Sequence, residues 1–165
     1  MYGRILVAFD GSPISNLALK ESIGLAKEMR AELRVVHVID EATLNWNAEV
    51  ADIAEIQART AGEKVLSKAA SVALEEGVKA ETKLLEIETR GHRVSEIIVR
   101  EAAAWPADLI VIGTHGRRGF SRLFLGSVAE GVARIATKPV LLVRSEDDPS
   151  SKTLERVAAD LAGAV

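Results

Sequence analysis

A glycine pattern in the last third of the chain is the feature that most clearly indicates chemistry. Its spacing is G-x2-G-x9-G-S, formed by Gly113, Gly116, Gly126 and Ser127. Glycine permits positive φ and lets a ligand approach the backbone amides closely. A helical pattern begins at Ser127, and the free N–H groups of a helix N-terminus attract anions. Three arginines in the same segment could cover further negative charge: Arg117, Arg118 and Arg122. The spacing predicts a cradle for a chain of phosphates.

The same residues also have an interpretation without a ligand. Residues 127–130 read S-V-A-E, which is typical of a capping box in which Ser127 satisfies its own helix. Glycine-rich loops also occur where nothing binds. One serine can fill both roles, because its hydroxyl and the first amides of the helix face the same way. The spacing alone leaves phosphate binding and a ligand-free loop both open.

Composition and missing motifs exclude several other classes of function. The chain has no cysteine, which excludes thiol catalysis, disulfides and thiolate metal sites. Its net charge of −3 disfavours duplex nucleic acid as a partner. It has no G-x-x-x-x-G-K-[ST], which excludes a P-loop NTPase. No G-x-G-x-x-G follows the first apolar run, and Asp40 alone is weak evidence for a dinucleotide-binding domain.

The apolar run at the start of the sequence is short. It is too short for the core of a signal peptide and far too short to span a bilayer. We therefore expect a cytoplasmic protein that does not associate with membranes.

Short apolar runs alternate with longer helical patterns along the chain. Strands are expected at residues 5–9, 33–39, 79–86, 109–112 and 140–143. Helices are expected at residues 13–30, 48–76, 92–104 and 127–136. Ser12 followed by Pro13 is typical of a helix start, and Gly77 is typical of a helix stop. The expected apolar stripes of the first two helices contain Leu17, Leu19, Ile23, Leu25 and Ala26, and then Ile53, Ile56, Leu66, Ala69 and Ala73.

This alternation predicts an α/β fold with a doubly wound, five-stranded parallel sheet flanked by helices on both faces. Continuous apolar runs suit strands buried on both faces, whereas the more polar residues 79–86 suit an edge strand. Ligands of such sheets bind beyond the carboxyl ends of the strands, where the strand order reverses. Residues 9–12 and 113–116 follow the first and fourth strands, so we expect these two loops to form the site.

Single polar residues near these ends have competing interpretations. Asp10 precedes a glycine and could be only a turn residue, but its place at an expected switch point favours a role in binding. His115 lies in the glycine segment and could help to hold phosphate, although no acid–base relay is evident near it. His37 is expected to be a structural residue of a buried strand, and His92 receives no role.

Several stretches, matched in order, resemble the ATP-binding branch of the universal stress protein family. They are ILVAFDGSPISNLALKESIGLAKE, LRVVHVID, DLIVIGTHGRRGFSRLFLGSVAEGV and TKPVLLVR. The resemblance covers residues 1–145 and implies one Rossmann-like domain, similar to adenine nucleotide alpha-hydrolases. It further implies that the ligand is ATP, usually with Mg²⁺ or Mn²⁺, and that the protein forms a homodimer.

The resemblance also implies a role for individual positions. Asp10 would contact the ribose or order the metal and its waters, with Gly11 and Ser12 completing its loop. Val38 would hold adenine through its backbone amide and carbonyl. The remaining ATP-binding positions lie in or just after the glycine segment: Gly113, Thr114, His115, Gly116, Arg117, Gly126, Ser127 and Val128. The resemblance assigns no protein side chain as a certain metal ligand.

The end of the chain carries two further expectations. Residues 140–143 form the last expected strand, so they should lie near a sheet edge, where they could pair with their copy in a homodimer. The alternative is that the protein's own tail covers this edge. Residues 146–165 read as a polar linker followed by a short amphipathic helix with Leu154, Val157, Ala158 and Leu161 on one stripe.

Three functions fit these observations. The first is a nucleotide-responsive regulator of the stress response, in which bound ATP shifts the affinity for a partner. The second is a slow ATP hydrolase, which is disfavoured because no general base for water is evident. The third is a dimeric scaffold or interaction protein that does not depend on nucleotide, which is disfavoured because the glycine pattern is retained.

Overall fold

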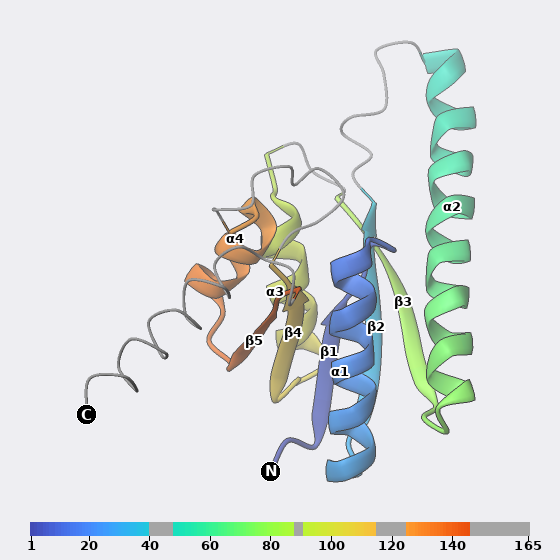
Figure 1. Cartoon of the computed structure of the whole chain (residues 1–165). Helices are drawn as coiled ribbons and strands as arrows, with labels where there is room; N and C mark the ends of the chain where they lie inside the picture. The colour runs from blue at the N-terminus through green and yellow to red at the C-terminus, as the bar shows by residue number, and fades with distance from the viewer. Residues whose placement is uncertain (40–47, 88–90, 115–124, 146–165) are drawn as a thin grey trace, which may run out of the picture.

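The computed structural model describes residues 1–39, 48–87, 91–114 and 125–145. Nine elements follow one another within these ranges, as Figure 1 shows. The strands are β1 (Arg4–Ala8), β2 (Glu32–Ile39), β3 (Ala80–Glu86), β4 (Leu109–Gly113) and β5 (Val140–Val143). The helices are α1 (Pro13–Met29), α2 (Ala48–Glu75), α3 (Val94–Ala104) and α4 (Ser127–Ile135). The predicted alternation of strands and helices is confirmed.

The five strands form one parallel sheet in the order β3-β2-β1-β4-β5. The chain first moves from β1 outward to β3, and then returns to the other side of β1 with β4. The strand order therefore reverses between β1 and β4, as the sequence predicts. The strands β3 and β5 are the two edges, which confirms the expectation for both.

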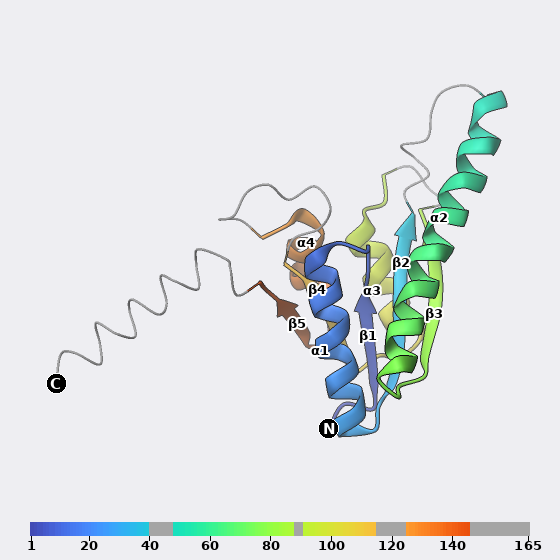
Figure 2. The ribbon, with the colours of Figure 1, turned by 45° about the vertical axis from the view of Figure 1, so that its right-hand side comes forward.

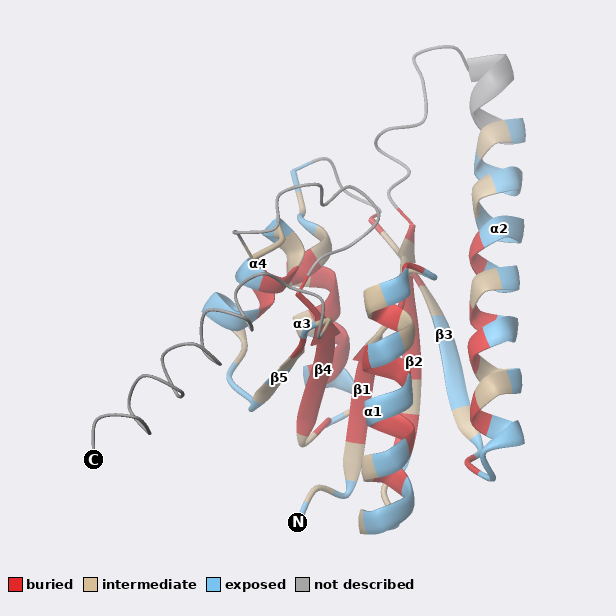
Figure 3. Ribbon diagram, in the orientation of Figure 1, coloured by how far each residue is buried: buried red, intermediate tan, exposed pale blue. Residues whose placement is uncertain are grey.

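Helices cover both faces of the sheet, with α1 and α2 on one face and α3 and α4 on the other (Figure 2). Successive strand residues alternate between the two cores: Val35 packs beneath α1 and α2, whereas Val36 packs beneath α3. The central strands are buried on both sides (Figure 3). This burial explains why their sequences are continuously apolar.

The first helix begins as its sequence predicts. Ser12 is the N-cap, and its Oγ accepts a hydrogen bond of 3.2 Å from the N–H of Ser15. The buried face of α1 differs in one position from the expected stripe, because Leu17 is exposed. The buried residues of α1 are Ser15, Ala18, Leu19, Ser22, Ile23 and Ala26.

The second helix is buried only toward its carboxyl-terminal half. Leu66, Ala69 and Ala73 are buried against the sheet, but Ile53 and Ile56 are exposed, contrary to prediction. The helix has 28 residues and β2 has eight, so at about 1.5 Å and 3.3 Å per residue α2 is much the longer element. Its first turns therefore extend past the sheet, as Figure 1 shows. Gly77 follows the helix with φ of +78°, which confirms it as the stop.

The start of α3 and the N-cap of α4 differ from the sequence interpretation. The third helix begins at Val94 with Arg93 as its N-cap, two residues later than expected. The fourth helix begins at Ser127, as predicted, but its N-cap is Gly126, which has no side chain to cap the helix. Ser127 is thus the first helical residue, so the alternative interpretation of Ser127 as the cap of its own helix is wrong.

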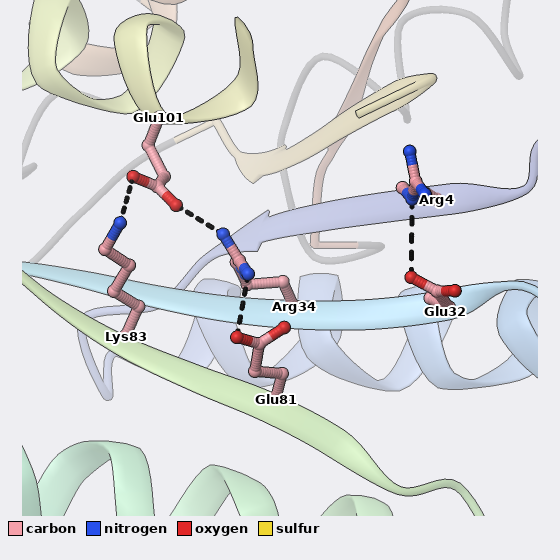
Figure 4. A network of polar contacts seen from close by, with 6 residues as sticks. All are labelled: Arg4, Glu32, Arg34, Glu81, Lys83 and Glu101. Carbon is pink, nitrogen blue, oxygen red and sulfur yellow. Dashed lines mark hydrogen bonds and ion pairs between the residues drawn. The ribbon is translucent and has the colours of Figure 1, made fainter. Parts of the chain in front are cut away.

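A charged cluster joins α3 to the sheet (Figure 4). The buried carboxylate of Glu101 accepts hydrogen bonds from Arg34 Nη1 at 2.6 Å and Lys83 Nζ at 2.7 Å. Arg34 also donates to Glu81 at 2.7 Å, and its guanidinium lies 4.5 Å from the ring centre of Trp105. The cluster therefore links the last turns of α3 to β2 and β3.

Candidate functional site

The candidate site is the carboxyl edge of the sheet where β1 and β4 lie side by side. Pairing of the two strands runs from Ile5 with Leu109 to Val7 with Val111, so they end at the same edge. The loop after β1 contains Asp10, Gly11 and Ser12. The glycine segment begins at the end of β4. The topology thus brings together the two loops that the sequence predicts.

The loop after β1 is a tight turn held by its own polar groups. Asp10 Oδ1 accepts a hydrogen bond of 2.9 Å from the N–H of Ser12. Gly11 between them has φ of +78°, a conformation that favours glycine. Asp10 therefore does have the structural role of a turn residue. That role fixes the carboxylate at the end of β1, where a binding role would also need it.

Two residues that the sequence interpretation missed stabilise this loop. Ser15 Oγ donates to the carbonyl of Ser12 at 3.0 Å and accepts from the N–H of Asp10 at 3.4 Å. Asn16 Nδ2 donates to the carbonyl of Ser12 at 2.8 Å. The available signal was the presence of two short polar side chains in the first turn of the helix, where such side chains can bond to nearby backbone groups.

At Gly113 the end of β4 touches the first turn of α1. A Cβ atom at Gly113 would lie 2.7 Å from Ile14 Cγ2 and 3.2 Å from the carbonyl carbon of Ile14. Only glycine lets the first turn of α1 lie this close to the end of β4. The first glycine of the pattern therefore has a packing role that is independent of any ligand.

Backbone hydrogen bonds of Thr114 join the two described ends of the glycine segment to each other and to β5. Its N–H donates to the carbonyl of Val143 at 2.9 Å, which ties it to β5. Its own carbonyl accepts from the N–H of Gly126 at 2.7 Å. The side chain of Thr114 is buried, with 1% of its surface exposed. The start of α4 is thereby fixed beside the end of β4.

The first turn of α4 supplies backbone amides at this edge. Gly126 has φ of −61° and ψ of 145°, so its glycine is not required by a positive φ. The absence of a side chain at this N-cap instead leaves the first amides of the helix uncovered by a capping group. Ser127 is exposed and Val128 is partly buried. An uncapped helix start is suited to an anion.

The end of β2 completes the edge on the other side of β1. Pairing with β1 ends where Ala8 meets Val36, and the carbonyl of Val36 accepts from the N–H of Phe9 at 2.9 Å. Backbone groups of a strand alternate sides, so those of Val38 also point to the β1 side. They face the region beyond the end of β1, while the side chain of Val38 packs in the core.

His37 has a structural position at the same end of β2. Its side chain is buried, and its Nδ1 lies 2.7 Å from the carbonyl oxygen of Phe9. Because a carbonyl only accepts, Nδ1 is the donor in this contact. The bond fixes the end of β1 to β2, in agreement with the predicted structural role.

Other predicted positions lie outside the described residues. These are His115, Gly116 and Arg117, together with Arg118, Arg122, Asp40 and residues 146–165. Within the described ranges, no three side chains of His, Asp or Glu gather in a group that could hold a metal ion. The helices of the same ranges include none long and apolar enough to cross a membrane.

Comparison with known proteins gives consistent matches. The protein-family model described as "Universal stress protein family" matches residues 1–144. The universal stress protein YxiE of Bacillus subtilis is 36% identical over 153 residues, which covers 87% of this chain and 100% of the relative. A crystal structure of a protein from the universal stress protein family of Burkholderia pseudomallei is 33% identical, with a TM-score of 0.72. It covers 87% of this chain and 97% of its own.

Two similar structures contain adenine nucleotides. The universal stress protein from Archaeoglobus fulgidus, solved in complex with dAMP, is 30% identical, with a TM-score of 0.62. The match covers 86% of this chain and 98% of that protein. A universal stress protein in complex with cAMP is 26% identical with a TM-score of 0.65, and the match covers 86% and 97% of the two chains.

Proposed function

Because the chain belongs to the universal stress protein family, we propose that it binds ATP at the carboxyl edge of β1 and β4 and acts as a nucleotide-responsive regulator. The observation that carries this proposal is the start of α4. Its first turn, which Gly126 leaves uncapped, is bonded through Gly126 to Thr114, and the preceding Gly113 contacts Ile14 in the helix that follows the loop of Asp10. The dAMP and cAMP complexes of similar proteins support an adenine nucleotide as the class of ligand.

The described residues suggest how the parts of the nucleotide would be held. The backbone N–H and C=O of Val38 would pair with the edge of adenine, since they point beyond the end of β1. Asp10 would contact the ribose or the waters of a bound Mg²⁺ or Mn²⁺, which prefer oxygen ligands. The amides of Ser127 and Val128 would receive phosphate oxygens. The metal would neutralise phosphate charge.

Hydrolysis of the bound nucleotide is expected to be slow at most. Efficient transfer of a phosphoryl group requires a positioned water and groups that stabilise the developing charge. His37 is buried and already bonded to Phe9, and the carboxylate of Asp10 accepts from Ser12. Neither is arranged as a base for water. The protein therefore suits a role in which occupancy, rather than turnover, changes its conformation.

A substitution at the N-cap of α4 tests ATP binding directly. Aspartate is a favoured N-cap residue, so Gly126→Asp should preserve α4 while its carboxylate occupies the position proposed for phosphate. We expect affinity for a fluorescent ATP analogue with Mg²⁺ to fall by about 100-fold, because like charges oppose binding strongly. Titration by fluorescence polarisation measures this change.

The matched control is Gly126→Asn, which has nearly the same shape without the charge. It should retain more affinity than Gly126→Asp, since it blocks the amides but does not repel phosphate. Circular dichroism should show both variants folded. If Gly126→Asp bound the analogue as tightly as the unchanged protein does, the helix start would not be the phosphate site.

A scaffold that works without nucleotide is the second candidate. It is favoured by one observation: Gly113 and Asp10 both have structural roles that need no ligand. In that case Gly113 would preserve the contact of β4 with α1, and the protein would act through its surfaces. Absence of ATP binding by the unchanged protein, with a folded and oligomeric state retained, would favour this candidate.

A further inference from the structure

The helices α3 and α4, which cover the same face of the sheet, approach each other very closely at one point. Ser95 is the second residue of α3, and Gly131 is the fifth residue of α4. A Cβ atom at Gly131 would lie 2.5 Å from Ser95 Oγ and 2.7 Å from Ser95 Cβ. Both residues are buried. The helices are therefore in contact at a distance that only glycine at position 131 permits.

A side chain at this point could not be accommodated by local rotation. Rotation about χ1 would move Ser95 Oγ away, but Ser95 Cβ would stay where the backbone holds it. On either side of Gly131, Ala129 and Val132 are buried in the core beneath α3 and α4. A methyl group at position 131 would therefore move α4 as a body, because packed interiors transmit strain.

The contact matters because the start of α4 lies only one turn from Gly131. The N–H of Gly126 is fixed to the carbonyl of Thr114, and the amides of Ser127 and Val128 follow. We propose that Ser95 and Gly131 are positioning residues for ligand binding. Their contact sets where the first amides of α4 stand relative to the phosphates. This inference rests on the proposed function and names the pair of residues that tunes its phosphate subsite.

The test compares ATP with adenosine, which lacks the phosphates. In Gly131→Ala, displaced amides should weaken ATP binding at least about fivefold, because hydrogen bonds weaken steeply outside their narrow geometry. Adenosine affinity should stay within about twofold of the unchanged protein. Isothermal titration with each ligand measures both. If Gly131→Ala stayed folded and bound both ligands equally weakly, that result would overturn the proposal.

Two rescue variants distinguish the contact from other effects of the methyl group. Ser95→Gly removes both Oγ and Cβ, so Ser95→Gly with Gly131→Ala should recover ATP affinity. Ser95→Ala removes only Oγ, and its Cβ would still lie 2.7 Å away, so that pair should not recover. Equal recovery by both pairs, or by neither, would overturn the proposal. If Gly131→Ala alone does not fold, recovery of folding by Ser95→Gly but not by Ser95→Ala supports the same contact.

The control and a measurement without ligand complete the design. Gly24→Ala changes an exposed glycine of α1 that has no neighbour within 4 Å, so it should leave the binding of both ligands unchanged. In ¹⁵N-labelled protein without nucleotide, Gly131→Ala should shift the amide resonances of Ser127 and Val128. Unshifted resonances would overturn the proposal even if ATP binds. Absence of ATP binding by the unchanged protein would instead reject the proposed function, and the resonances would still decide whether the contact positions α4.

Discussion

At the scale of single residues, Gly113 is constrained by its neighbour and not only by a ligand. Substitution by alanine should destabilise the protein by about 1–3 kcal/mol, the cost of overpacking, since the carbonyl carbon of Ile14 cannot rotate away. Urea denaturation of Gly113→Ala measures the loss in the free energy of unfolding. The added change Ile14→Ala removes Cγ2 and should recover part of it. An unchanged midpoint would contradict the packing role.

Asp108 directly precedes β4, at the amino-terminal end of the strand, and its carboxylate gives a prediction on the pH dependence of stability. The pKa of Asp108 is lowered because it accepts hydrogen bonds from the N–H groups of Gly3 at 2.9 Å and Arg4 at 3.0 Å, with Lys138 adding a favourable charge. A lowered folded-state pKa stabilises the protein above the ordinary Asp pKa of about 3.9, and this stabilisation is lost as the pH falls through the folded value.

The variant Asp108→Asn should therefore be less stable than the unchanged protein at pH 7. The difference should shrink as the pH falls below about 3.9, because protonated Asp108 no longer attracts those two N–H groups as a charge. Thermal unfolding of both proteins across this pH range measures the difference. A gap that stays constant with pH would show that the two hydrogen bonds do not stabilise the charged form.

At the scale of elements, the attachment of α3 depends on a buried charge. Glu101 neutralises Arg34, and their side chains are 7% and 11% exposed. Glu101→Gln should destabilise the protein by about 3 kcal/mol, because the buried guanidinium of Arg34 would lose its buried counter-charge and keep only the more exposed Glu81. Glu32→Gln is the control, since its pair with Arg4 is exposed and should contribute less than about 1 kcal/mol.

A double variant separates the cost of an unpaired charge from the value of the pair. Replacing both Arg34 and Glu101 by leucine removes both charges from the interior and should recover much of the stability lost in Glu101→Gln. Chemical denaturation measures all four proteins. Equal losses in Glu101→Gln and Glu32→Gln would show that the cluster contributes no more than a surface pair.

The elements themselves were largely predictable, because their patterns follow from burial. Continuous apolar runs indicated β1, β4 and β5, and Ser12 with Pro13 indicated the start of α1. The errors arose where local chemistry competes with tertiary contacts. Ser127 can be read as a cap, yet it is the first helical residue and Gly126, which is bonded to Thr114, is the N-cap. The helical pattern predicts Ile53 in the core, but Ile53 is exposed because the helix extends past the sheet. A helical pattern does not show where the neighbouring sheet ends.

The candidate site was predictable in part. Its two loops follow from strand order, because β1 and β4 must be neighbours at the point of reversal. The contact of Ile14 with Gly113 and that of Ser95 with Gly131 could not be predicted, since each joins residues far apart in the sequence. Such close approaches become visible only when a Cβ atom is placed in the folded chain.

At the scale of the whole molecule, we propose that the edge strand β5 forms the interface of a homodimer. Its backbone lies at the end of the sheet, and unpaired strand edges favour pairing with another chain. Apolar side chains flank this edge on both faces: Leu141 is 36% exposed, and Ile135 at the end of α4 is 38% exposed. A two-fold axis beside β5 would place these apolar side chains against the same residues of the second chain.

Charge placed at this edge should separate the dimer. Leu141→Lys would set two like charges close together across the axis, so we expect a monomer in sedimentation velocity where the unchanged protein sediments as a dimer. Leu74→Lys, on the exposed face of α2, is the control and should remain a dimer. A dimer that persists in Leu141→Lys would place the interface elsewhere. If instead the unchanged protein is a monomer, and it dimerises once residues 146–165 are removed, then the tail covers this edge.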